Sequence, residues 1–136
     1  MIKKYLILFT LAAVIFSCNN QTKKEEPVTD IDVANTFVRD LLDNDFKEAE
    51  KYLLKDETNN QIFERFKKQY SGKDKAILEK YRKADIIVNE TGYVTDSVFI
   101  FNYSNSYSRS DKTILKLLRI DKKWLVDLKY TFSGNL

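Results

Sequence analysis

The chain contains Leu117-Leu118-Arg119-Ile120-Asp121-Lys122-Lys123-Trp124-Leu125-Val126-Asp127, a segment that predicts two antiparallel strands joined by a tight turn. We expect the first strand at residues 112–120, the turn at 121–123 and the last strand at 124–131. The last strand alternates apolar and polar residues, which is typical of a strand with one buried face. One face carries Trp124, Val126, Leu128 and Tyr130, and the other carries Leu125, Asp127 and Lys129. We therefore expect the Asp127 side chain to be exposed.

Two further strands are predicted before this hairpin. Residues 85–91 are short and β-branched, Gly92 and Asp96 bracket an expected turn, and residues 97–103 form the next strand. Aromatic and aliphatic residues alternate along that strand. Phe99, Phe101 and Tyr103 lie on one face, and Val98 and Ile100 lie on the other. Because both faces are apolar, we expect a central strand with one face toward the helices. The other face has three interpretations: a partner surface, a pocket wall, or a surface covered by sheet curvature.

Residues 29–82 show helical spacing and helix-capping residues. Thr29 with Asp32 forms a capping pair for a first helix, and Asp45 with Glu48 forms one for a second helix at residues 46–54. A third helix is expected at residues 58–70 and ends at Ser71-Gly72, whereas residues 74–82 are ambiguous. The apolar positions of the first helix are Ile31, Ala34, Phe37, Val38, Leu41 and Leu42.

Helices followed by a strand meander predict one α+β domain, with the N-terminal helices packed on an antiparallel four-stranded sheet. We place this domain at residues 29–132. A polar tether is expected at residues 18–28, and a short tail at residues 133–136.

The residues Leu42, Asp45-Phe46, Ala49 and Tyr52-Leu53 form the pattern Leu-x-x-Asp-Phe-x-x-Ala-x-x-Tyr-Leu. Together with residues 117–127, this pattern resembles small bacterial lipoproteins with a nuclear-transport-factor-2-like domain, a cystatin-like, lumazine-binding-like cone. The resemblance covers residues 29–131. It implies helices packed into the concave face of a curved sheet, often with an apolar pocket at the wide end. Glycine is common in that family where this chain has Lys122 or Lys123.

The residues that we place at such a pocket are Tyr52, Phe99, Phe101 and Trp124. Trp124 has a second interpretation, as a core side chain that anchors the last strand against the first helix, because it shares a face with Val126 and Leu128. No catalytic residue of the family's enzymes matches a residue of this chain.

Residues 1–17 resemble an export signal. Lys3 and Lys4 precede the apolar run at residues 5–16, which is too short for a comfortable transmembrane helix. The ending Ile15-Phe16-Ser17-Cys18 resembles a bacterial lipobox, with Phe16 bulkier than the usual residue. The resemblance implies cleavage before Cys18 and acylation of that cysteine, for example by palmitate. Asn19 is not the aspartate that retains enteric lipoproteins at the inner membrane, which favours the outer membrane, on the periplasmic or the external side.

The composition restricts the possible chemistry. The 136 residues include no histidine, and Cys18 is the single cysteine. Catalytic triads and catalytic zinc sites nearly always need one of these residue types, so we expect neither a metal nor another cofactor. Asp85, Asp96 and Asp127 are the strand carboxylates to consider, and we expect the first two at strand ends. The net charge of +3 falls to about +1 without residues 1–17, which argues against a nucleic-acid partner.

Two surface segments are candidate binding sites. Residues 65–83 are basic, which suits either an anionic lipid or glycan, or a solvated helix face. Residues 102–110 are rich in Tyr, Ser and Asn, a composition shared by recognition loops and by ordinary polar hairpins. If this hairpin binds a partner, we expect Tyr103, Tyr107 and Arg109 to make the contacts.

These observations favour a membrane-anchored, non-enzymatic binding or accessory module. Its partners would be the lipid bilayer, through acylated Cys18, and an envelope protein, a glycan or a small apolar ligand. One alternative is a small pocket enzyme of isomerase or dehydratase type that uses carboxylates and tyrosines. Another is a structural envelope protein with no pocket. A buried carboxylate of raised pKa inside an open pocket would distinguish the enzyme.

Overall fold

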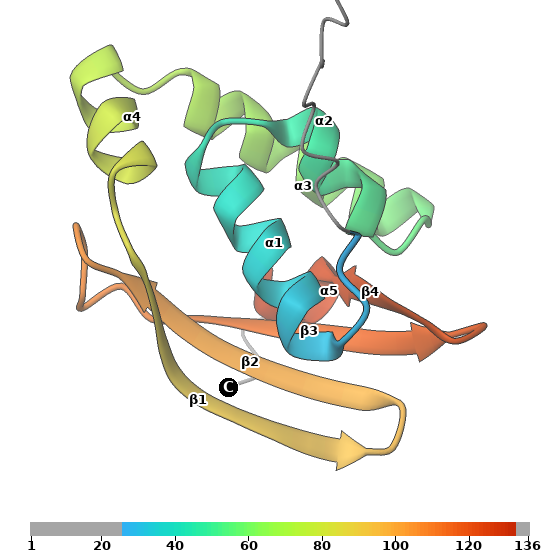
Figure 1. Ribbon diagram of the computed structural model, residues 1–136. Helices are drawn as coiled ribbons and strands as arrows, with labels where there is room; N and C mark the ends of the chain where they lie inside the picture. The colour runs from blue at the N-terminus through green and yellow to red at the C-terminus, as the bar shows by residue number, and fades with distance from the viewer. Residues whose placement is uncertain (1–25, 133–136) are drawn as a thin grey trace, which may run out of the picture.

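The computed structural model describes residues 26–132 (Figure 1). The predicted signal at residues 1–17, the predicted acylation site Cys18, most of the predicted tether and the predicted tail at 133–136 lie outside the described residues. Within residues 26–132, no helix is both long and apolar enough to span a membrane. The elements are α1 (Asp30–Leu42), α2 (Phe46–Ala49), the 3-10 helix η1 (Glu50–Tyr52), α3 (Glu57–Ser71), α4 (Lys75–Arg82), β1 (Ile86–Thr95), β2 (Val98–Asn105), β3 (Thr113–Ile120), β4 (Lys123–Asp127) and α5 (Leu128–Phe132).

Helix α1 begins with the predicted capping box. The Thr29 hydroxyl accepts a hydrogen bond from the Asp32 N–H (3.2 Å), and the Asp32 carboxylate accepts one from the Thr29 N–H (3.4 Å). Ile31, expected on the apolar face, is 43% exposed instead. It lies at the edge of the buried face because the first turn presents Asp30 to the sheet, where its carboxylate accepts a hydrogen bond from the Tyr93 hydroxyl.

The second helix is shorter than predicted. Helix α2 ends at Ala49 and η1 ends at Tyr52, because Leu53 is extended and pairs with Val126 in an isolated β-bridge. The Leu54 N–H donates to the Val126 carbonyl (2.9 Å), which stabilises this extended conformation. Helix α3 confirms the predicted third helix, and α4 shows that the ambiguous segment is helical.

The sheet is an antiparallel meander in the order β1-β2-β3-β4. The turn predicted between Gly92 and Asp96 is wrong, because β1 continues to Thr95 and Gly92 pairs with Ile100 of β2. Glycine weakens a strand but does not interrupt its backbone hydrogen bonds. The connection between β1 and β2 is therefore only two residues long, at positions 96 and 97.

The last strand is also shorter than predicted. Strand β4 ends at Asp127 and α5 follows, where the alternation predicted a strand to residue 131. Asp127, expected outside, is only 5% exposed, and its carboxylate accepts a hydrogen bond from the Lys129 N–H (3.2 Å). The chain changes from strand to helix here because Asp127 satisfies a free N–H group of the first turn.

The turn between β3 and β4 was predicted correctly. Asp121 and Lys122 both have positive φ angles, of 49° and 65°. Such angles at both central residues are those of a two-residue type I′ turn, whose twist matches that of the flanking strands. Lys122 therefore adopts a backbone conformation for which glycine is usually selected.

Helices α1 to α4 lie on the same side of a curved, unclosed sheet (Figure 1). The core fills the space between them, and its largest fully buried side chains include Phe37, Phe63, Phe101, Leu115 and Leu117. The predicted α+β architecture, with N-terminal helices on a curved four-stranded antiparallel sheet, is confirmed at this level.

Candidate functional site

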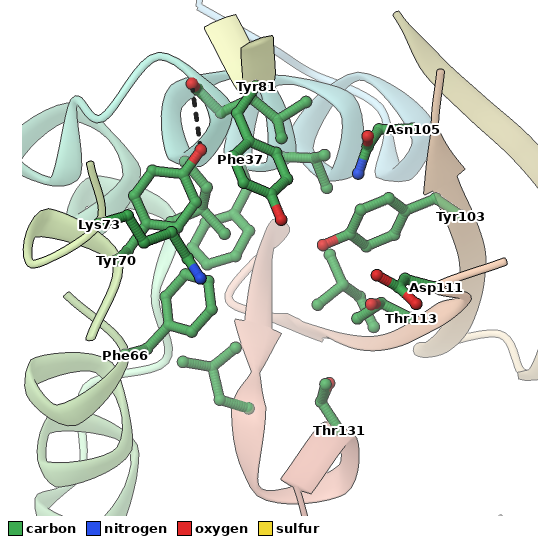
Figure 2. Close-up of a pocket in the computed structure, with 15 residues that line it drawn as sticks. Phe37, Phe66, Tyr70, Lys73, Tyr81, Tyr103, Asn105, Asp111, Thr113 and Thr131 are labelled. Atoms are coloured by element: carbon green, nitrogen blue, oxygen red, sulfur yellow. Dashed lines mark hydrogen bonds between the residues drawn. The ribbon is translucent and has the colours of Figure 1, made fainter. Parts of the chain in front are cut away.

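An open cavity of about 260 Å³ lies between α1, the end of α3, α4 and the sheet (Figure 2). Its floor belongs to the hydrophobic core. Helix α1 contributes Phe37, Val38, Leu41 and Leu42 to this floor, and Leu115 and Leu128 contribute from β3 and α5. Because these residues are buried in the core, the cavity is an unfilled part of the helix–sheet interface.

Three tyrosines surround the cavity. The Tyr70 hydroxyl donates to the Leu42 carbonyl (3.3 Å), whereas the hydroxyls of Tyr81 and Tyr103 point toward the cavity (Figure 2). Burial raises the pKa of Tyr70 and of Tyr81, and it raises the pKa of Tyr103 to about 12 against the opposing effect of a hydrogen bond with Thr113. All three phenols are therefore protonated at neutral pH and can donate hydrogen bonds.

Aromatic contacts position these tyrosines. The ring centroids of Tyr70 and Tyr81 lie 5.4 Å apart, which joins the end of α3 to α4. Tyr107, from the loop between β2 and β3, packs edge-on against Tyr81 at 5.1 Å. The Asn105 side-chain oxygen accepts hydrogen bonds from the N–H groups of Tyr107 (3.1 Å) and Ser108 (2.9 Å), so this loop is fixed beside the cavity.

The charged lining residues are Lys73 and Asp111. Figure 2 shows the Lys73 amine between the rings of Phe66 and Tyr70, turned toward the cavity. In the part of the chain that the structure describes, this amine forms no ion pair. Asp111 lies across the cavity and accepts a hydrogen bond from the Ser108 hydroxyl (2.5 Å). The two charges therefore lie on opposite sides of the cavity.

The four residues proposed from the sequence for a pocket do not line this cavity. Phe99 and Phe101 are 2% and 0% exposed and belong to the core, and Tyr52 is half-buried against it. Trp124 is also half-buried, with its ring 6.4 Å from the rings of Phe99 and Tyr93 at the edge of the core. Trp124 and Tyr93 border a separate, shallow hollow near the start of α1.

The three hairpin residues proposed as binding contacts lie in different environments. Tyr103 is on β2 and lines the cavity. Tyr107 is 43% exposed beside the cavity, and the Lys80 amine lies 5.3 Å from its ring centroid. Arg109 is exposed in the loop between β2 and β3. The cavity thus includes one of these three residues.

The other sequence candidates lie outside the cavity, with one exception. Asp85 and Asp96 are exposed next to strand ends, as expected, and neither they nor Asp127 line the cavity. The basic segment 65–83 covers the second half of α3, the connection at residues 72–74, α4 and the residue after it, and some of its cations pair with nearby glutamates. The exception is Lys73, which this segment contributes to the cavity.

Sequence reasoning missed Tyr70, Tyr81 and Asp111 at the cavity, whereas Lys73 and Asn105 belong to the candidate segments 65–83 and 102–110 without having been singled out. Tyr70 and Tyr81 occupy apolar positions of helical periodicity, and this pattern does not distinguish a core residue from a pocket residue. Lys73 was one of several lysines in a basic segment.

Within residues 26–132, no group of three His, Cys, Asp or Glu side chains could hold a metal ion. No protein family, curated protein or solved structure was found to match the chain. The chemistry of the cavity is therefore inferred from its geometry, which combines an apolar floor with phenol, amide and amine donors.

Proposed function

We propose that this protein is a lipid-anchored binding module of the bacterial cell envelope, and that its pocket holds a small, largely apolar ligand. The observation that carries this proposal is the cavity of about 260 Å³ with an apolar floor and a few polar groups at its rim. Binding sites for small molecules typically combine these two features. The volume lies below the range of about 300–1,000 Å³ for drug-sized ligands, so we propose a smaller molecule.

A nuclear-transport-factor-2-like cone is the domain type that we propose. Helices on one side of a curved, unclosed antiparallel sheet support it. Leu42, Phe46, Ala49 and Leu53, which carry part of the sequence resemblance, are all buried. A cavity between the helices and the sheet is the feature that such cones often have.

The arrangement of carboxylates favours binding over catalysis. Asp111, at the cavity, is exposed and accepts a hydrogen bond from Ser108. The buried carboxylates Asp30, Asp40 and Asp127 do not line the cavity. An acid–base step in the cavity would depend on tyrosines whose pKa is raised further from neutrality, which is unfavourable for general catalysis. The isomerase or dehydratase alternative therefore has less support.

The envelope location is proposed from the lipobox-like segment that ends at Cys18. Cells grown with labelled palmitate should label the wild-type protein, and Cys18→Ser should abolish the label because the acceptor thiol is lost. Label that persists in Cys18→Ser would contradict the proposed anchor.

The pocket can be tested by filling it. 1-Aminoanthracene, a small neutral apolar dye, should bind the purified domain and become fluorescent. Thr113→Trp, at a half-buried lining position of β3, should weaken this binding about tenfold or more. Thr95→Trp, at an exposed position of β1 away from the cavity, is the matched control. If both variants keep the fold by circular dichroism and bind the dye equally well, the cavity is not the binding site.

A further inference from the structure

We propose that the ligand of this pocket is a single-chain amphiphile with a carboxylate head group, and that Lys73 binds this carboxylate. This inference rests on the proposed function, because it identifies the chemical class of the ligand in the same pocket. It is carried by the positions of the polar groups around the cavity.

Lys73 places a cation at the edge of an apolar cavity. The amine is directed between the rings of Phe66 and Tyr70 toward the cavity (Figure 2), and it has no carboxylate partner within residues 26–132. Some basic residues of the same segment have carboxylate partners, since Lys67 pairs with Glu64 (3.6 Å) and Lys83 pairs with Glu79 (3.3 Å), whereas what distinguishes Lys73 is its position at the cavity. A carboxylate bound at Lys73 would give this amine a charge-assisted hydrogen bond.

The neutral polar groups at the cavity also suit an anion. The hydroxyls of Tyr81 and Tyr103 point toward the cavity, and their raised pKa values keep them protonated at neutral pH. The amide nitrogen of Asn105 points the same way (Figure 2). The Lys73 ammonium matches the single charge of a carboxylate, and the Tyr81 hydroxyl, which lies between Lys73 and Asp111 in Figure 2, can donate to an acceptor oxygen of the ligand.

The remaining lining restricts the ligand further. Asp111 lies across the cavity from Lys73 and would repel an anion, so the head group should lie on the Lys73 side. The apolar floor below then receives the hydrocarbon chain. A cavity of about 260 Å³ suits one chain of about ten carbons better than a lipid with two long chains.

The test compares two ligands that differ only in the head group. We would titrate the domain with decanoate and with decan-1-ol, below their aggregation limits, by isothermal calorimetry at pH 7. Wild type should bind decanoate about tenfold more tightly than decan-1-ol, because only the acid gains the charge-assisted contact. Lys73→Met should lose this preference by weakening decanoate binding about tenfold while leaving decan-1-ol binding unchanged.

Two further variants test whether the effect is local. Lys75→Met removes a nearby exposed cation that does not line the cavity, and it should leave both affinities unchanged. Asp111→Asn should strengthen decanoate binding about twofold, because it removes a like charge that faces the head group from across the cavity.

The outcomes separate this inference from the proposed function. If wild type binds both ligands equally and Lys73→Met changes neither affinity, the carboxylate ligand is overturned and the apolar pocket stands. If Lys73→Met weakens both ligands alike, Lys73 acts by packing, and the carboxylate contact is again overturned. If neither ligand binds, the proposed pocket function fails and this inference fails with it.

Discussion

Asn59 closes one end of the space between the helices and the sheet, whereas three tyrosines border the other end. The Asn59 side chain is fully buried, and its oxygen accepts a hydrogen bond from the Leu128 N–H (2.8 Å). Its amide donates to Asp56 (2.9 Å), whose carboxylate also pairs with the Lys129 amine (2.5 Å). We refer to Asp56, Asn59, Leu128 and Lys129 as the Asn59 clasp.

The other end, which we call the tyrosine end, is bordered by Tyr70, Tyr81 and Tyr103. Its contacts are of a different kind. The rings of Tyr70 and Tyr81 pack at 5.4 Å, and the hydrogen bond from Tyr70 to the Leu42 carbonyl is 3.3 Å long. Hydrogen bonds of 2.5–2.9 Å surround the fully buried Asn59 side chain, whereas the tyrosine end borders the cavity of about 260 Å³. The comparison indicates that stability is concentrated at the Asn59 end and binding capacity at the tyrosine end.

The largest expected effect is at Phe63, which is 2% exposed and lies 5.7 Å from Phe46 and 6.4 Å from Phe37 by ring centroids. Phe63→Ala should lower the free energy of unfolding by about 3–5 kcal/mol, because it opens a cavity in a filled region. Phe66→Ala, at the half-buried wall of the existing cavity, should cost about 1–2 kcal/mol. Urea denaturation measures both. Equal losses would show that the two ends are equally well packed.

Asn59→Ala should have the next largest effect. The Leu128 N–H would lose its partner inside the protein, at a cost of about 2–3 kcal/mol in the free energy of unfolding. Asn60→Ala is the control, because Asn60 is an exposed neighbour on the same helix and its loss should stay within about 0.5 kcal/mol. If Asn59→Ala and Asn60→Ala melt at the same temperature, the Asn59 clasp does not stabilise the fold.

The tyrosine end should respond to alkaline pH. The pKa of Tyr103 is about 12 in the folded protein, because its partly buried hydroxyl is desolvated, against about 10 when exposed. The folded state keeps a proton that the unfolded state releases, so stability is complete below pH 10 and falls by about 2 kcal/mol as pH rises toward 12. Tyr103→Phe should reduce this dependence in urea titrations between pH 9 and 11.5, whereas Tyr107→Phe, at an exposed ring, should not. If the free energy of unfolding falls equally with rising pH in both variants, Tyr103 is not the cause of the alkaline loss of stability.

The Asn59 clasp should respond to acid, with the smallest of these effects. Hydrogen bonds from the Asn59 N–H and then from Lys129 lower the pKa of Asp56. As the pH falls, the unfolded state therefore protonates Asp56 before the folded state does. The stabilisation from Asp56 is complete above its ordinary pKa of about 4, and it is lost as the pH falls through the lower pKa of the folded state. Asp56→Asn should show a shallower loss of melting temperature below pH 4 than wild type. Asp85→Asn, at an exposed position before β1, is the control for a general charge effect.

The starts of the first helices could be predicted because their causes are local. Thr29 with Asp32, and Asp45 with the Glu48 N–H, form hydrogen bonds across three residues. Strand alternation and the charged turn near Lys122 likewise predicted the meander. Residues within one turn or one hairpin supply all the information that such features need.

Three element boundaries were predicted incorrectly because their causes are distant in the chain. Leu53 leaves the helix to pair with Val126, and Gly92 stays in a strand because it pairs with Ile100. Asp127 is buried where α5 packs against α3 and β3. Periodicity describes the faces of an element but does not say which other element ends it.

The sequence by itself determined the α+β class and the caps of the first two helices, and it showed that the chain has one cysteine and no histidine. The tertiary structure alone decided the cavity, because Tyr70, Tyr81 and Tyr103 come from α3, α4 and β2 and meet only when these elements pack. The tertiary structure also decided which lysine of residues 65–83 lies at the cavity, namely Lys73. Local hydrogen bonds and side-chain periodicity are present in any short window of sequence, whereas an unfilled volume depends on how separate elements fit together.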